Sequence, residues 1–422
     1  QAGDYFNFFA GSAIALSDAD PVDMNISATR PAKLKAVLPT PSGLLLFAEN
    51  SQFLLKSQDV AFGPSTANLN EVSSYAYNSQ VKPVETGVSL LFHTESDTFS
   101  KVFEMSIESL DSRPVATENT RIVPELIPTN LTNITAVPNQ SLVLFGDGSE
   151  TMFAFKFYNS GNERQLAGWT KWEFATPIKL TAFDHDTGYF IGRNGDATIL
   201  SRMELIDNPD TAQIDAGGAR FQPRLDHYVG SNKLTTETLP DTSVRVRLPA
   251  GMAVSGKSVF LAATFAASQT FYVSGNIQTD ATGDYFDVTN ALLNTEFVVG
   301  LGYQMSVELP SFYVKEGDNN RADRRNYPMV ESAYIDLYFS GRYDCIVKRL
   351  GYDDITVPLE IVRSDIYLAN SSSIVDSATS QIPVFAHGNT STLTILADGP
   401  LPASLTSYHW EGHYSTRGIQ RR

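Results

Sequence analysis

The chain has 422 residues, of which 42% are hydrophobic and 18% are charged, and its 25 phenylalanines and 18 tyrosines require an extensive core. The formal net charge of −16 disfavours tight binding of DNA or RNA, which relies on Lys and Arg to displace phosphate counterions. The single cysteine, Cys345, excludes an intramolecular disulfide and a cysteine-based zinc cluster. No run of 18 apolar residues occurs, so we expect no membrane-spanning segment, and we interpret the start at Gln1 as lying inside a longer or processed protein.

The first half repeats one phrase, in which an apolar run ends in phenylalanine and is followed by a polar turn and a second apolar run. The phenylalanines lie at 47, 92, 145 and 190, at intervals of 45, 53 and 45 residues. Three to four antiparallel strands per repeat at this period are typical of β-propeller blades. We therefore predict an all-β fold in which residues 1–208 form the blades of an incomplete propeller whose N-terminal part is missing. A β-sandwich with evenly spaced strands is the alternative.

Beyond Pro209 the period is lost and a second β-rich region, residues 209–422, is predicted to be β-sandwich or barrel-like. Alternating apolar and polar residues indicate strands along its length. The best helix candidate is 288–299. The expected strands are 243–248, 258–265, 270–273, 334–339, 344–349 and 392–397, and in the first half 169–174 is expected to supply an outer strand.

Residues 251–258 read Gly-Met-Ala-Val-Ser-Gly-Lys-Ser and match the phosphate-binding P-loop pattern completely. That motif needs a buried parallel strand before it and a helix after it, so that backbone N–H groups converge on phosphate. Here both flanks alternate like antiparallel strands. We therefore interpret the segment as a turn containing a lysine, with no nucleotide cofactor.

Three further clusters contain residue types that occur in catalytic or metal sites, but we interpret none of them as such a site. Asp184-His185-Asp186 is expected to be a turn stabilised by aspartate side chains rather than an acid–base pair. The acidic segment 18–23 lacks the full ligand spacing of a calcium loop, and His409 and His413 are too far apart along one strand for a zinc pair. We predict no catalytic, cofactor-binding or metal-binding residues.

Several segments in chain order resemble the tail tubular protein B family, the nozzle proteins of short-tailed bacteriophages. They are GDYFNF at 3–8, DADPVD at 18–23, the Leu-Leu-Phe strand within 43–53, WTKWEF at 169–174, FVVGLGY at 297–303 and WEG at 410–412. The resemblance spans nearly the whole chain, which would correspond to the C-terminal part of a longer protein.

The resemblance implies a non-enzymatic virion protein of the phage tail that forms a homohexameric ring. Such a ring would conduct and gate genomic double-stranded DNA without binding it specifically, and would contact an adaptor ring similar to tail tubular protein A and the tail fibres. An acidic channel fits this role, because it repels the DNA backbone. From the exposed loop 315–326 we expect Arg321, Arg324 and Arg325 to contact neighbouring subunits or partners.

A glycan-binding surface propeller, or a carbohydrate-active enzyme, is the alternative from a different class. A glycosidase would need two carboxylates about 5–10 Å apart in a pocket. The 47 acidic residues leave that pairing open but give no positive sign of it. The tryptophans Trp169, Trp172 and Trp410 are expected to lie in the core rather than at an interface.

Overall fold

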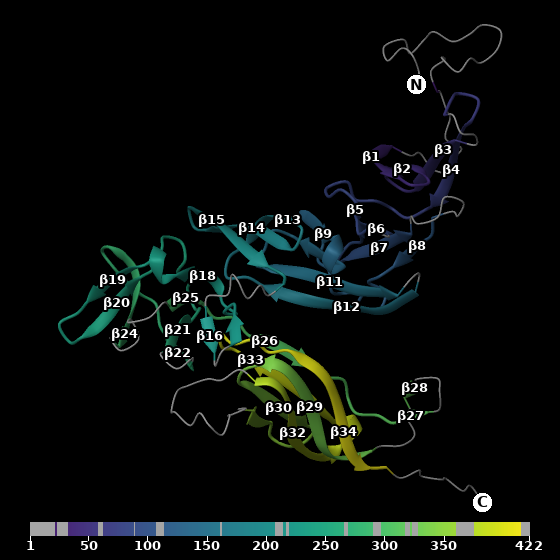
Figure 1. Ribbon diagram of the computed structural model, residues 1–422. Helices are drawn as coiled ribbons and strands as arrows, with labels where there is room; N and C mark the ends of the chain where they lie inside the picture. The colour runs from purple at the N-terminus through teal and green to yellow at the C-terminus, as the bar shows by residue number, and fades with distance from the viewer. Residues whose placement is uncertain are drawn as a thin grey trace, which may run out of the picture. The chain divides into compact units, whose positions relative to one another are not determined.

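The computed structural model divides the chain into two compact units, Gln1–Leu205 and Ile206–Arg422. Both units are built from antiparallel β-sheets, and the described residues contain only short 3-10 turns as helical elements, which confirms the all-β prediction (Figure 1). The structure describes residues 22, 33–57, 62–87, 89–106, 114–160, 163–206, 214–216, 219–265, 269–289, 297–316, 321–322, 328–359 and 375–414.

The first unit contains four sheets, each made of strands that follow one another in the chain. Within each sheet every strand pairs with the next strand in the chain, as in a propeller blade. The first sheet contains β1 (Leu34–Thr40), β2 (Gly43–Ala48), β3 (Gln52–Ser57) and β4 (Ala67–Ser73), and the second contains β5 (Val84–Glu85), β6 (Ser89–Glu95), β7 (Ser100–Ser106) and β8 (Ala116–Glu118). The third contains β9 (Asn133–Val137), β10 (Leu142–Gly146), β11 (Thr151–Ser160) and β12 (Glu163–Glu173). The fourth contains β13 (Ile178–Asp184), β14 (Thr187–Asn194) and β15 (Ala197–Glu204).

The four repeated phenylalanines occupy the same place in each sheet, the second strand, and all four are buried. Phe47 lies in β2, Phe92 in β6, Phe145 in β10 and Phe190 in β14. The rings of Phe47 and Phe92 meet edge to face with centroids 5.2 Å apart, which joins the first two sheets. The sequence period therefore marks one buried position per sheet.

Successive side chains of one strand pack on opposite neighbouring sheets, because side chains alternate across a strand. In β6, Phe92 joins the core shared with β2 and β3, whereas Leu91 joins the core shared with β10 and β11. In β10, Phe145 belongs to that same second core, and Leu144 packs towards Phe190 of the fourth sheet. The sheets thus stack face to face in chain order.

The second unit contains two pairs of larger sheets, and within each of these sheets neighbouring strands do not follow chain order throughout. One pair of sheets has the orders β18-β25-β21-β22 and β19-β20-β24-β23. Gly275 of one lies against the ring of Phe286 in the other, where a Cβ would stand 3.5 Å from it. Their strands are β18 (Asp226–Gly230), β19 (Thr235–Thr238), β20 (Ser243–Arg247), β21 (Val259–Phe265), β22 (Gln269–Gly275), β23 (Gln278–Asp280), β24 (Gly283–Thr289) and β25 (Phe297–Leu301).

The other pair forms a β-sandwich around one apolar core. Its sheets have the orders β26-β33-β30-β31 and β32-β29-β34, and Ile335, Cys345 and Ile395 lie in the core between them. The strands are β26 (Met305–Glu308), β29 (Met329–Ser340), β30 (Tyr343–Arg349), β31 (Ile355–Leu359), β32 (Val375–His387), β33 (Ser391–Ala397) and β34 (Leu405–His413). Two small hairpins complete the unit: β16 (Ile214–Ala216) with β17 (Ala219–Phe221), and β27 (Lys315–Glu316) with β28 (Arg321–Ala322).

The expected strands of the second unit and the outer strand at 169–174 are confirmed, with boundaries shifted by a few residues. The helix expected at 288–299 is wrong at both ends. Residues 288–289 are the last two of β24 and residues 297–299 are the first three of β25. Residues 290–296 lie outside the described residues. Short apolar runs fit a buried strand as well as a helix, so periodicity alone misassigned them. All three tryptophans pack partly buried against cores, as expected.

Candidate functional site

The segment that matches a P-loop is a pair of turns between β20 and β21, which belong to two different antiparallel sheets. The Met252 N–H donates to the Pro249 carbonyl at 3.1 Å, and the Lys257 N–H donates to the Val254 carbonyl at 3.2 Å. The chain then enters β21 directly, with no helix whose N-terminus could receive a phosphate. The interpretation as a turn containing Lys257 is confirmed.

Asp184-His185-Asp186 forms the turn between β13 and β14, as expected. His185 adopts a φ of +53° and its Nδ1 lies 2.8 Å from the Asp184 carboxylate, with both side chains exposed. Asp186 accepts a hydrogen bond from the Gln140 side-chain amide at 2.9 Å. The position of the turn is as expected, whereas the two aspartates contact the His185 ring and the Gln140 side chain.

The other candidate ligands do not assemble a metal centre in the described part of the chain. His409 and His413 lie along β34 and each faces a different carboxylate, Asp336 at 3.9 Å and Glu331 at 2.9 Å. No group of three His, Cys, Asp or Glu side chains suited to a metal ion occurs among the described residues. The acidic segment 18–23 lies outside them, apart from residue 22.

Of the predicted contact loop, only one arginine falls within the described residues. Arg321 opens strand β28, which pairs with β27 as a two-stranded hairpin. Arg324 and Arg325 lie outside the described residues. The contact role of the three arginines therefore stays a prediction.

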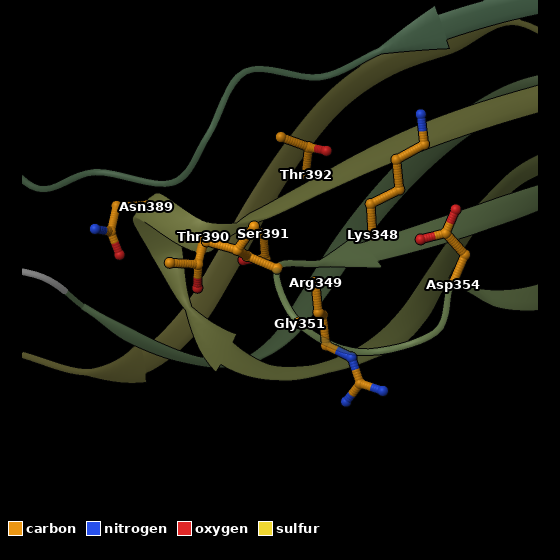
Figure 2. A pocket seen from close by; sticks show the side chains of 9 residues that line it. Lys348, Arg349, Gly351, Asp354, Asn389, Thr390, Ser391 and Thr392 are labelled. Carbon is orange, nitrogen blue, oxygen red and sulfur yellow. The ribbon is translucent and has the colours of Figure 1, made fainter.

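The sandwich carries a hollow of about 430 Å³ where the β30–β31 turn meets the 3-10 turn after β32. Lys348 and Arg349 are neighbours on β30, so their side chains leave opposite sides of the strand, as Figure 2 shows. The Arg349 guanidinium instead lies 5.2 Å from the ring centroid of Tyr352. The charged side chains that line the hollow therefore do not converge on one point where they could bind a ligand together.

One charged contact joins the second and third sheets of the first unit. Arg164 of β12 donates two hydrogen bonds to the Glu104 carboxylate of β7, at 2.5 and 2.6 Å, and its guanidinium lies 4.6 Å from the ring centroid of Phe157. Burial raises the pKa of Glu104, but hydrogen bonds from Arg164, Ser89 and Asn119 outweigh burial and leave that pKa lowered. The carboxylate is thus held ionised between two sheets.

A second charged network covers the sheet β19-β20-β24-β23. Arg245 pairs with Asp287 and with Asp280, and Arg247 pairs with Asp280 at 2.7 Å and with Glu237. The Arg245 guanidinium also lies 3.7 Å from the ring centroid of Tyr285. Hydrogen bonds from Arg247 and Thr282 lower the pKa of Asp280. These cations are neutralised by carboxylates of their own sheet and are not free for phosphates.

The sheet β13-β14-β15 carries one apolar row across its three strands on the face that also bears Arg193 and Arg202. Leu180, Ile191 and Leu200 face one another across the three strands in register. Leu180 and Leu200 are 60% and 68% exposed. Exposed apolar rows of this kind mark interaction surfaces.

Sequence reasoning did not single out these pairings, because residues such as Glu104 and Arg164 are 60 positions apart. No local pattern links two such positions. One general signal was available. Burying a charged side chain costs free energy unless it is paired, so an arginine in a strand segment rich in aromatic residues is expected to have a carboxylate partner.

The described residues form an all-β protein of stacked antiparallel sheets with charged side chains paired within and between sheets. The family model for bacteriophage nozzle proteins matches residues 1–421, so the chain belongs to that family. It is accordingly a structural component of the phage virion tail, and the alternative of a carbohydrate-active enzyme is wrong.

A curated relative, tail tubular protein gp12 of Escherichia phage T7, is 22% identical over 428 residues. The match includes 99% of this chain and 53% of the T7 protein, so the chain spans about half the length of that relative. A solved structure, the WD40 domain of SCAP from fission yeast, covers 87% of this chain and 84% of that chain at 10% identity, with a TM-score of 0.12, at which the likeness carries no structural conclusion.

Among the described residues, no helix is long and apolar enough to cross a membrane.

Proposed function

We propose that this chain forms part of the homohexameric distal nozzle of a short phage tail, which conducts and gates genomic DNA during ejection. The observation that carries the proposal is the match to the nozzle family over residues 1–421. The ring would sit below an adaptor ring and beside the tail fibres.

The electrostatics of the chain support a conduit that does not retain DNA. The net charge of −16 repels a polyanion, and several arginines on the described surface already have carboxylate partners. These are Arg164, Arg193, Arg202, Arg245 and Arg247. Cations engaged in this way contribute little to phosphate binding, so DNA would pass without specific contacts.

The domain organisation is part of the proposal. Residues 1–208 would contribute blades to a propeller completed by parts of the protein outside this chain, and residues 209–422 would form the platform or nozzle region. The exposed row of Leu180, Ile191 and Leu200 supports an additional blade, because the covered faces of the other sheets are apolar in the same way. A cysteine at position 200 should react with a thiol reagent in this chain alone and be protected in the full-length protein. Equal reactivity in both would contradict the propeller.

Electron microscopy of the full-length protein, alone and with its candidate adaptor ring, tests the assembly. Sixfold top views with a central channel, and stacking on the adaptor, are expected. Charge reversal of Arg321, Arg324 and Arg325 together should weaken contacts between subunits or with the adaptor. Dispersed monomers under both conditions would contradict the nozzle and favour a glycan-binding surface protein.

A further inference from the structure

The fourth sheet of the first unit has one strand fewer than the other three sheets in the described structure. The sheets that contain β2, β6 and β10 have four strands each, whereas β13-β14-β15 has three (Figure 1). The repeated phenylalanine lies in the second strand of every sheet, so β13, β14 and β15 correspond to the first three strands of the larger sheets. The strand without a counterpart among the described residues is therefore the fourth, whose place is beside β15.

One hydrogen bond shows which backbone groups of β15 point away from β14. The Leu205 N–H, directly after the strand, donates to the Asp186 carbonyl at 2.9 Å. The two strands pair without a register shift, and the residues that bond to the partner alternate along an antiparallel pair. The N–H and C=O groups of Thr198, Leu200 and Arg202 therefore point away from β14, and no other described strand joins the sheet on that side. We call these groups the outer edge of β15.

The outer edge of β15 lacks the bulge and the proline by which proteins commonly protect a sheet edge from pairing. Among the last strands of the other sheets, β8 has only three residues. The pairing of β4 with β3 and that of β12 with β11 are each interrupted by a register shift. By contrast, β15 has eight residues, contains no proline and is regular along its whole length. Of these four described strands, β15 is the one most open to pairing with a further strand.

The side chains of β15 indicate what kind of strand fits beside it. Ile199 and Met203 are partly buried, and Met203 packs against the core that contains Phe190. On the opposite face, Leu200 is 68% exposed at the end of the row that starts at Leu180. Neighbouring strands stabilise a sheet through side-chain pairs on each of its faces. The strand that fits here is therefore apolar on both faces where it lies beside Ile199 and Leu200.

We propose that a strand from the part of the full-length protein outside this chain pairs antiparallel with the outer edge of β15 and completes the fourth sheet. The proposal rests on the blade organisation proposed above and adds the strand that gives this blade the usual four. The length of the T7 relative supports a source in the same polypeptide, because this chain spans only 53% of that protein.

A strand from a neighbouring copy of the protein is the competing occupant. It is disfavoured because the three larger sheets of this unit each take all four of their strands from consecutive segments of one chain. A fourth blade built in the same way stays within one polypeptide.

Hydrogen exchange in the full-length protein, measured residue by residue from fragment masses, tests whether the outer edge is paired. The amides of Ile199, Ser201 and Met203 face β14 whether or not a fourth strand is present, so they provide the control within the same strand. We expect the three amides of the outer edge to exchange within about 10-fold of the control rate. Exchange at least about 100-fold faster at the outer edge would show that it is free and would overturn the proposal.

Photo-crosslinking in the full-length protein identifies the strand. A photoreactive phenylalanine derivative in place of Leu200 should be joined by light to a peptide of the same polypeptide outside residues 1–422, and the product should migrate as a single chain on a denaturing gel. The same derivative in place of Leu166, which is 70% exposed on β12, is the matched control and should not give that product. Two joined copies of the protein, a peptide from within residues 1–422 or a peptide from a different protein would each overturn the assignment of the strand.

The outcomes separate this proposal from the blade organisation on which it rests. A fast-exchanging outer edge, together with a cysteine at position 200 that is protected from a thiol reagent, would leave the additional blade in place and remove only the fourth strand. A fast-exchanging outer edge together with a reactive cysteine at that position would contradict both.

Discussion

Arg164 and Glu104 form a two-point ion pair that joins strand β12 of one sheet to strand β7 of the next. The pair lies over Phe157 and is mostly removed from water, with side-chain exposures of 26% for Arg164 and 12% for Glu104. The geometry is that of a planar guanidinium matched to a carboxylate, which a lysine would not reproduce. This contact fixes the register between two stacked sheets at a point where apolar packing alone has no directional preference.

Arg164→Met is expected to lower the free energy of unfolding by about 3 kcal/mol, because Glu104 is then left largely buried without its cation. The double variant Glu104→Gln/Arg164→Met should recover part of that loss, since no uncompensated charge remains. Urea unfolding of the three proteins at pH 7 measures both effects. Equal stability of Arg164→Met and the parent protein would show that the pair does not hold the sheets.

His93 makes the first unit sensitive to acid. Its ring is fully buried, neither ring nitrogen has a hydrogen-bond partner, and burial lowers its pKa to about 4. The unfolded chain, in which histidine titrates near about 6.5, binds the proton first as pH falls. Stability from this residue is therefore complete above about pH 6.5 and falls by about 3 kcal/mol as the pH reaches about 4.

His93→Leu should remove that part of the pH dependence. Unfolding free energies of the variant and the parent are compared between pH 7.5 and pH 4.5, so that carboxylates, which titrate in both proteins, cancel in the difference. We expect the parent to lose more stability on acidification than the variant. Parallel pH profiles would contradict a buried neutral imidazole.

The repeated phenylalanines are expected to carry much of the stability of the stacked sheets. Phe145→Ala removes a fully buried ring from the core between the second and third sheets and should cost about 3–5 kcal/mol. Phe385→Ala is the matched control, because that ring is 63% exposed, and it should change stability by less than about 1 kcal/mol. Thermal or denaturant unfolding compares the two. A similar cost for both would argue against the buried role of the repeat.

The turn at 251–258 should not bind nucleotides. Addition of ATP with Mg²⁺ is expected to leave the unfolding transition unchanged, since a ligand that binds only the folded state would raise it. Lys257→Ala should alter neither stability nor the response to ATP. A concentration-dependent rise in the unfolding midpoint that disappears in Lys257→Ala would overturn the interpretation as a turn.

The repeat at 47, 92, 145 and 190 was visible in sequence because each phenylalanine occupies one structural position that recurs with every sheet. The strands around Val246 and Ile335 were likewise predictable from alternation. The segment 288–299 was misassigned because the apolar residues at its two ends belong to two different strands, β24 and β25, and their spacing alone does not separate a strand from a helix. Contacts such as Arg164 with Glu104, or Arg245 with Asp287, join distant parts of the chain and leave no local pattern.

Cryo-electron microscopy of tails arrested while DNA is leaving tests the central claim most directly. The account predicts a sixfold ring of this protein at the distal end of the tail, with DNA density running through its centre. Density for this protein as separate copies on the outside of the tail, with DNA leaving through a channel built by another component, would contradict it.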